Sequence, residues 1–232
     1  MTTRRERRNG LRLRHILLLF WRVALGLFFF LCVIIVVFAS VRPPPGFYMM
    51  SEGIRLQGFE QRWRPYEEIA PVMGRSVVAA EDANFCVHNG VDWDELFEVI
   101  EEGSNRGAST ISQQVAKNVF LWHGRSYLRK GIEIPLAVVI DRVWGKRRIL
   151  EVYLNVAEFD EGVFGVEAAA YHYFNVSAAD LSALQAARLA SILPDPKDRS
   201  ASNPGSFTNR RANQIVDGAA TIQADGRADC FD

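Results

Sequence analysis

The feature that most constrains this chain is residues 23–41, a run of 19 residues without a charged side chain. As an α-helix, at about 1.5 Å per residue, the run would be roughly 28 Å long, close to the hydrocarbon thickness of a lipid bilayer. It follows an arginine-rich segment, and Arg22 at its start can extend its side chain to the membrane interface. We therefore predict a basic tail over residues 1–15 and a transmembrane anchor over residues 16–41.

A cleaved signal peptide and a buried core helix are the two alternatives for this segment. A signal peptide has a shorter apolar core that ends in small residues, whereas this run continues into VRPPPG at residues 41–46, a poor cleavage sequence. The sequence therefore favours a retained anchor. Because arginine and lysine stay on the cytoplasmic side of a membrane, we expect the N-terminus in the cytoplasm and residues 42–232 outside it.

The formal net charge of zero conceals a strong segregation of charge. Residues 1–42 hold eight of the 27 basic residues and one of the 27 acidic residues, so the remainder holds 19 basic and 26 acidic residues, a formal charge of −7. A nucleic-acid phosphate backbone needs a positive protein surface. The composition therefore argues against nucleic acid as a partner.

The rest of the chain is long enough for one well-buried domain and too short for two large ones. We predict a linker over residues 42–60 that opens with a stiff PPPG segment, one domain over residues 61–220, and a C-terminal tail over residues 221–232. Apolar spacing at helical period dominates the domain. The expected fold is mostly α, with one larger lobe and a smaller insert around residues 91–106.

Capping signals and apolar spacing locate the helices. Thr110 and Gln113 form a capping-box pattern, which predicts a helix start at Thr110. A second such pattern, Ser177 to Asp180, predicts another helix through residues 181–192. Further helices are predicted over residues 127–143, 146–156 and 166–174. The residues expected to face the core are Ile111, Val115, Val119 and Trp122 in the first helix and Leu136, Val139, Ile140 and Val143 in the second.

Two segments carry polar groups that a hydrophobic core does not need. Residues 81–90 read EDANFCVHNG, and residues 107–118 read GASTISQQVAKN. The first places two carboxylates side by side. On the helix of the second, Gln114, Lys117 and Asn118 share one face, so they can line a cleft. Adjacent carboxylates, amides and a lysine suit the transfer of a sugar that has a charged leaving group.

Both segments resemble signatures of the peptidoglycan glycosyltransferases, roughly E-D-x-x-F-x-x-H-x-G and G-[GA]-S-T-[IL]-[ST]-Q-Q-x-x-K-N. Residues 125–133, RSYLRKGIE, resemble the family pattern R-x-x-x-R-K-x-x-E, and residues 146–155, KRRILEVYLN, resemble K-x-R-I-L-E-x-Y-L-N. The resemblance extends over about residues 75–215 and is nearest to the monofunctional branch. It implies a lysozyme-like, two-lobed helical domain behind one transmembrane helix.

The resemblance implies that Glu81 is the catalytic base, although an isolated Glu-Asp pair is more often a solvated surface feature. Asp82 is expected to support the hydrogen bonds around the site, and His88 to be structural. Lys117 on an acidic domain could serve solubility alone, but its position in the motif implies a contact with pyrophosphate. The substrate-binding residues implied in these two segments are Asp82, Ser109, Gln114, Lys117 and Asn118.

Three further cations, Arg125, Arg129 and Lys130, would ordinarily form a solvated face. Beside Lys117 they are expected to clamp the charge that accumulates on a diphosphate. Glu133 matches the second essential carboxylate of the family, which assists at the donor side through cations or a divalent metal. The resemblance therefore allows a divalent cation, Mg²⁺ or Mn²⁺, and implies no organic cofactor.

The implied activity is the polymerisation of lipid II into glycan strands. Undecaprenyl pyrophosphate leaves, and C1 of MurNAc is inverted. No S-x-x-K or K-T-G triad occurs in the sequence, so no transpeptidase activity is expected. The implied location is the bacterial inner membrane with the catalytic domain in the periplasm. The implied partners are lipid II, the growing strand, the membrane and proteins of cell division or cell-wall synthesis.

Two rival functions are kept. A cell-wall hydrolase or lytic transglycosylase would need a single acid and no cationic clamp, whereas a non-catalytic scaffold would have lost the carboxylates. The cysteines do not decide between them. Cys32 lies in the predicted anchor, and the sequence leaves open whether Cys86 and Cys230 pair in an oxidising compartment.

Overall fold

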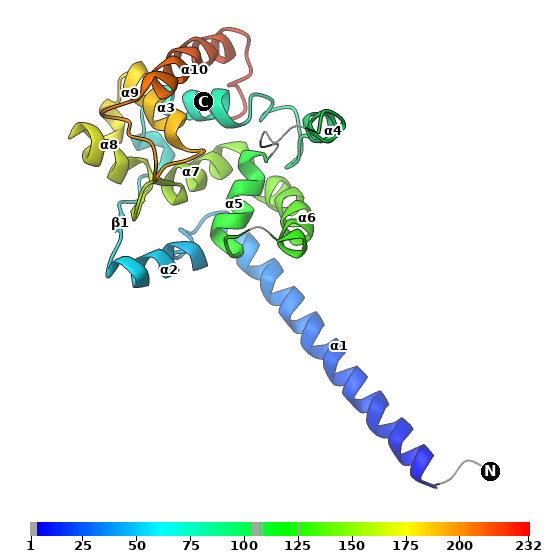
Figure 1. The fold of residues 1–232 in the computed structure, drawn as a ribbon. Coiled ribbons are helices and arrows are strands. Elements are labelled where there is room, and N and C mark those ends of the chain that lie inside the picture. Colours follow the sequence, from blue (N-terminus) through cyan, green and yellow to red (C-terminus); the bar gives the residue numbers. More distant parts are fainter. Residues whose placement is uncertain (1–3, 104–106, 108, 125) are drawn as a thin grey trace. The chain divides into compact units, whose positions relative to one another are not determined.

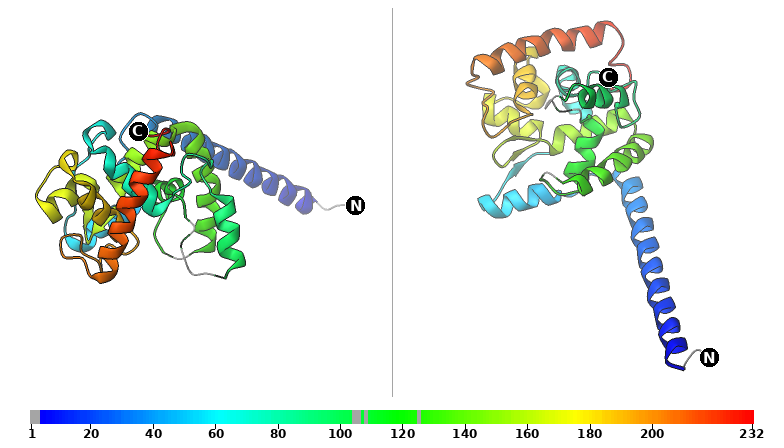
Figure 2. Two further views of the ribbon diagram at one scale, coloured as in Figure 1. Left: turned by 90° about the horizontal axis from the view of Figure 1, so that it is seen from above. Right: turned by 45° about the vertical axis from the view of Figure 1, so that its right-hand side comes forward.

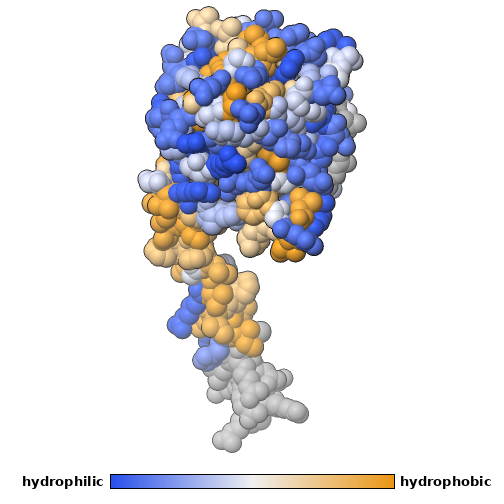
Figure 3. All heavy atoms as spheres, turned by 90° about the vertical axis from the view of Figure 1, so that its left-hand side faces the viewer, coloured by the Kyte–Doolittle hydropathy of each residue, from blue (hydrophilic) through white to orange (hydrophobic). Residues whose placement is uncertain are grey.

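The computed structural model describes all residues except 1–3, 104–106, 108 and 125, and its chain forms two compact units, Met1–Val41 and Arg42–Asp232. The first unit contains the helix α1 (Arg4–Phe38). Within it, Arg14–Phe38 is long and apolar enough to cross a membrane, and few of its side chains are buried. Figure 3 shows hydrophobic residues over much of α1 and a mostly hydrophilic surface on the displayed face of the second unit.

The second unit is mostly α-helical, so the predicted fold class is confirmed. Its small sheet has the strand order β1-β3-β2, in which β1 is parallel to β3 and β2 is antiparallel to it. The elements, in chain order, are α2 (Phe47–Leu56), β1 (Glu60–Gln61), the 3-10 helix η1 (Tyr66–Glu68), α3 (Pro71–Glu81), α4 (Trp93–Glu101), α5 (Ile111–Phe120), α6 (Tyr127–Trp144), α7 (Lys146–Val156), β2 (Glu158–Asp160), β3 (Val163–Phe164), α8 (Val166–Phe174), the 3-10 helix η2 (Ala178–Asp180), α9 (Ala183–Ile192) and α10 (Ser206–Ala224).

The start of α5 agrees with the predicted capping box. The Thr110 side chain accepts a hydrogen bond from the Gln113 amide, and the Gln113 side chain accepts one from the Thr110 amide. The predicted start of the helix at 181–192 was wrong, because Ser177 caps only the short helix η2. Ser182 and Gln185 form the capping box that begins α9.

The predicted inner faces were partly wrong. In α6, Val139 and Val143 are exposed, and the buried stripe instead includes Ala137 and Asp141, whose small or polar side chains escape a search for large apolar residues. Trp122 is also exposed. The helix α5 ends at Phe120 and its helical spacing does not continue to residue 122.

The helices of the second unit pack in two groups. The long helix α10 lies across α3 and α9, as the views in Figures 1 and 2 show, while α5 packs against α6 and α7. The segments expected to be a linker and a tail also carry structure. Residues 42–60 include α2, and Phe231, close to the C-terminus, is 1% exposed. Both ends of this unit are therefore built into the domain.

Candidate active site

Glu81 is the last residue of α3, which begins with Pro71 at its first position and buries Met73, Val77 and Val78 in the core. This packing holds the backbone that carries the carboxylate in a fixed position. Its Oε2 accepts a hydrogen bond from Nε2 of Gln114, at 2.9 Å. Burial raises the pKa of Glu81 above its ordinary value, against the opposing effects of Gln114 and of the positive charges nearby.

Gln114 is oriented by a residue that sequence reasoning missed. The hydroxyl of Tyr153, in α7, donates to Oε1 of Gln114 at 3.2 Å. Burial raises the pKa of Tyr153 well above its ordinary value, so this phenol stays protonated. The amide oxygen of Gln114 therefore faces Tyr153 and its NH₂ group faces Glu81. Tyr153 lies in a recognised motif, but an aromatic residue at helical spacing reads simply as part of the core.

Asp82 is 4% exposed and directs both of its oxygens at protein groups. One accepts from the backbone amide of Ile111 at 2.9 Å, and the other is 2.8 Å from Nε2 of His88. The carboxylate thus joins the residue after Glu81 to the first residue of α5. This arrangement fits the expected supporting role, whereas a direct contact with substrate would require these bonds to break.

Lys117 lies on the same helix as Gln114. Burial lowers the pKa of its ammonium, and the nearby charges include both Glu81 and Glu133. The fold therefore brings the two predicted carboxylates, one from α3 and one from α6, near the same lysine. The neighbouring Asn118 is 3.0 Å from Nε2 of His123. Burial lowers the pKa of His123 to about 3, so its neutral ring donates this hydrogen bond.

Glu133 is 3% exposed and is surrounded by cations of its own helix. Its carboxylate forms ion pairs with Arg129 and with Lys130, the latter at 2.7 Å. Lys130 also donates to the hydroxyl of Ser109 at 2.8 Å. Glu133 thus holds two of the four cations that were predicted to bind the diphosphate. The fourth predicted cation of this group, Arg125, lies outside the described residues.

A cleft of about 360 Å³ opens beside Gln114 and Lys117. Glu81 lies behind its wall, one hydrogen bond from Gln114. The other lining residues are Tyr48, Asn118, His123, Tyr153, Val156, Ala157, Glu158, Leu193, Pro194, Asp195, Pro196, Lys197 and Asp198. The cleft therefore combines two lysines with carboxylate, amide and aromatic groups, the kinds of side chain that can bind a sugar and a charged group attached to it.

The wall formed by α2 was missed from sequence because its segment reads as a linker. The ring of Tyr48 stacks on His123 with centroids 3.6 Å apart, and its hydroxyl donates to Glu158 at 2.6 Å. Lys197 pairs with Glu52 of the same helix at 2.7 Å. These contacts fix α2 to the segment after α5, to β2 and to the loop after α9.

A divalent cation held at this site by the protein alone would need a set of protein ligands. In the part of the chain that it describes, no group of three or more His, Cys, Asp or Glu side chains is arranged to hold a metal ion. Glu133, the residue expected to work with a divalent cation, instead has two protein cations as partners. The protein alone therefore provides no complete ligand set in these residues.

Comparison with known proteins gives a consistent result. The family model for transglycosylases matches residues 50–220. A biosynthetic peptidoglycan transglycosylase of Jannaschia sp. (strain CCS1) is 57% identical over 206 residues, which cover 89% of this chain and 86% of the relative. Proteins of the same name from Agrobacterium fabrum and Caulobacter vibrioides are 51% and 45% identical, covering 74% and 85% of this chain and 78% and 88% of their own. The chain belongs to the peptidoglycan transglycosylase family.

Proposed function

We propose that this transglycosylase polymerises lipid II into glycan strands and releases undecaprenyl pyrophosphate, with inversion at C1 of MurNAc. The observation that carries this proposal is the position of Glu81. It is a partly buried carboxylate with a raised pKa, held by Gln114 at the cleft wall and close to the charge of Lys117. A general base works best when its pKa lies near the operating pH, and burial moves the pKa of Glu81 in that direction.

In the proposed reaction, Glu81 accepts the proton of the C4 hydroxyl of an incoming GlcNAc. The oxygen then forms a bond to C1 of the MurNAc that ends the growing strand. The bond from C1 to the phosphate oxygen breaks, and the diphosphate leaves with the electron pair. Attack from the face opposite the leaving group converts the α-linkage into a β-linkage. The proton on Glu81 is afterwards lost to solvent.

The cations of the site would stabilise the leaving group. A diphosphate departs as an anion, so it needs positive charge rather than a general acid. We propose that Lys117 provides it, and the ion pairs of Glu133 with Arg129 and Lys130 support a second cationic group beside it. The group formed by Glu133, Arg129 and Lys130 has one negative and two positive side chains, so its formal net charge is positive. A divalent cation, Mg²⁺ or Mn²⁺, would take most of its ligands from the diphosphate and from water.

We further propose that α1 anchors the enzyme in the inner membrane with its N-terminus in the cytoplasm and the domain in the periplasm. The arginine-rich start of the chain supports this orientation. The disulfide between Cys86 and Cys230 also supports it, because such bonds persist in oxidising compartments. The proposed partners remain lipid II, the glycan strand and proteins of division or wall synthesis. No transpeptidase activity is proposed.

The test is to incubate the purified full-length protein with labelled lipid II, with Mg²⁺, with Mn²⁺ and with a chelator. We expect a ladder of glycan polymers and an equivalent amount of undecaprenyl pyrophosphate. Purified cell wall, incubated in parallel, should release no soluble fragments. Soluble fragments without any polymer would instead establish the rival hydrolase or lytic activity.

A further inference from the structure

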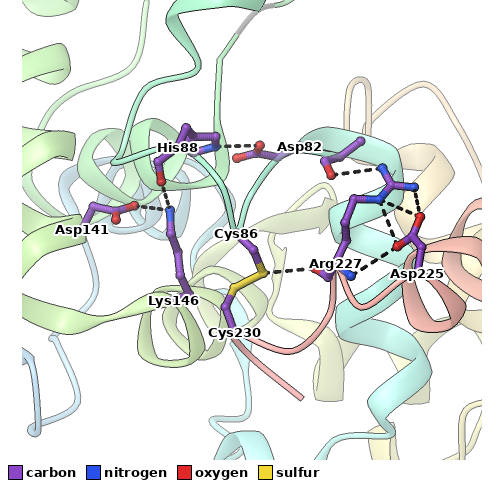
Figure 4. The surroundings of a disulfide bond; sticks show 9 residues. Asp82, Cys86, His88, Asp141, Lys146, Asp225, Arg227 and Cys230 are labelled. Carbon is purple, nitrogen blue, oxygen red and sulfur yellow. Dashed lines mark hydrogen bonds and ion pairs between the residues drawn. A yellow bond between two sulfur atoms is a disulfide. The ribbon is translucent and has the colours of Figure 1, made fainter.

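The last eight residues are fastened to the loop that follows Glu81 (Figure 4). A disulfide joins Cys86 to Cys230, which are 144 residues apart in sequence. Next to it, the rings of Phe85 and Phe231 pack with centroids 6.1 Å apart, and neither residue is more than 1% exposed. We call residues 225–232 the C-terminal clamp and residues 82–91 the motif loop.

The C-terminal clamp makes polar contacts as well. The guanidinium of Arg227 is held by Asp225 and donates to the carbonyl of Ala83 at 3.5 Å. The carboxylate of Asp232 pairs with Arg75 of α3 at 2.8 Å. The clamp therefore contacts both the motif loop and the helix that ends at Glu81.

The motif loop in turn is joined to α5 both directly and through side chains of the neighbouring helices. Asp82 accepts from the amide of Ile111, the first residue of that helix. The carbonyl of His88 accepts from Lys146 at 2.7 Å, Lys146 pairs with Asp141 at 2.7 Å, and Asp141 accepts from Ser112 of α5 at 2.8 Å. Figure 4 shows Lys146 between the His88 carbonyl and Asp141.

The far end of the loop fits tightly. Gly90 has φ of +84°, and a Cβ at this position would lie 2.6 Å from the carbonyl oxygen of Ala137 in α6. Its own carbonyl accepts from the hydroxyl of Thr110 at 2.6 Å. A shift of the loop would therefore be transmitted to the first turn of α5.

We propose that the C-terminal clamp positions the active site by fixing the motif loop between α3 and α5. The hydrogen bond from Gln114 to Glu81 spans these two helices, so its length depends on the motif loop, which follows α3 in the chain and is hydrogen-bonded to the start of α5. The inference rests on the proposed role of Glu81. Cys86, Arg227, Cys230 and Phe231 would be positioning residues, which act through Asp82 and α5 and contact no substrate.

The test compares the full-length protein with the Cys86→Ser, Cys230→Ser double variant, below the melting temperature of both. Displacements of about 1 Å in an active site can cost on the order of 10²-fold in rate. We expect kcat to fall about tenfold or more, with KM unchanged within about twofold. Amide hydrogen exchange at Ile111 should accelerate at least about tenfold, because its bond to Asp82 opens more often.

The matched control is Ile222→Ala, which removes a buried side chain from α10. It should lower the melting temperature without lowering kcat or exposing the Ile111 amide. The proposal is overturned if the double variant keeps the wild-type kcat and the wild-type exchange rate at Ile111. It is also overturned if Ile222→Ala, at an equal loss of melting temperature, changes kcat and this exchange rate as much as the double variant does. If the wild-type protein makes no polymer from lipid II, the proposed function fails, and exchange at Ile111 still decides whether the clamp positions α5.

Discussion

The two carboxylates of the site are both glutamates, but one has a neutral hydrogen-bond partner and the other has two cationic partners. Glu81 accepts a hydrogen bond from the neutral amide of Gln114, and burial raises its pKa. Glu133 is more deeply buried, at 3% exposure, and Arg129 and Lys130 form ion pairs with it. Desolvation raises the pKa of Glu81, which has no ion pair in direct contact among the residues that the structure describes, whereas Glu133 has two cations in direct contact.

This difference suits the two residues to different roles in the proposed reaction. A base must accept a proton during the reaction, which the surroundings of Glu81 favour. A carboxylate that must hold two cations in place gains nothing from accepting a proton, and Glu133 suits that task. The comparison also predicts that equivalent substitutions at the two positions affect activity and stability in different ways.

The largest effect is expected for Glu81→Gln, which keeps the shape of the side chain and removes the base. Turnover of lipid II should fall by about 10²–10⁴. Stability should not fall. Because the pKa of Glu81 is raised in the folded protein, ionisation of this residue lowers the free energy of unfolding once the pH exceeds the pKa that Glu81 has in the unfolded chain. Glutamine does not ionise, so it removes that destabilisation. Polymer assays and thermal unfolding at pH 7 measure both. Retention of more than half of the turnover would rule out Glu81 as the base.

Glu133→Gln should lower stability as well as activity. It leaves Arg129 and Lys130 beside a neutral amide, and a hydrogen bond to a charged group contributes about 1.5–3 kcal/mol. The melting temperature should therefore drop clearly below that of Glu81→Gln. Thermal unfolding of the two variants in one buffer provides the measurement. Equal melting temperatures would show that the two environments do not differ as described.

Lys117→Ala should weaken both the use of lipid II and the binding of moenomycin, a phosphoglycolipid that inhibits this family. A charge-assisted hydrogen bond contributes about 1.5–3 kcal/mol, which corresponds to roughly 10-fold to 150-fold in affinity. The control is Lys197→Ala, which removes a cation from the same cleft that is already paired with Glu52. A direct binding assay with the inhibitor compares them. Equal losses would mean that overall cleft charge matters, and not the position of Lys117.

Much of this molecule could be predicted from its sequence, and the failures have physical reasons. Capping residues and helical spacing act locally, so the start of α5 and the shared helix face of Gln114, Lys117 and Asn118 were accessible. Tyr48 and Lys197 enter the cleft from α2 and from the loop after α9, and only the tertiary fold brings them there. The partners of Glu133 were visible at helical spacing, but their direction toward the carboxylate was not.

The smallest expected effect is a change in the pH dependence of kcat/KM. Activity should rise with pH as Glu81 loses its proton, with a midpoint above that of an ordinary glutamate, because burial raises its pKa. The hydrogen bond from Gln114 and the charges of Lys117 and Arg211 lower this pKa, whereas Asp82 raises it. Gln114→Ala should therefore move the midpoint to higher pH.

The matched control for that shift is Asn118→Ala, which changes the same helix and the same cleft but removes no bond to Glu81. It should leave the midpoint unchanged. A midpoint that moves to lower pH in Gln114→Ala would show that water replaces the amide and solvates the ionised carboxylate better than Gln114 does. In that case Gln114 would raise the pKa of Glu81 by excluding water from the carboxylate more than it lowers that pKa by its hydrogen bond. The difference between the surroundings of Glu81 and Glu133 would then depend on the space that Gln114 fills.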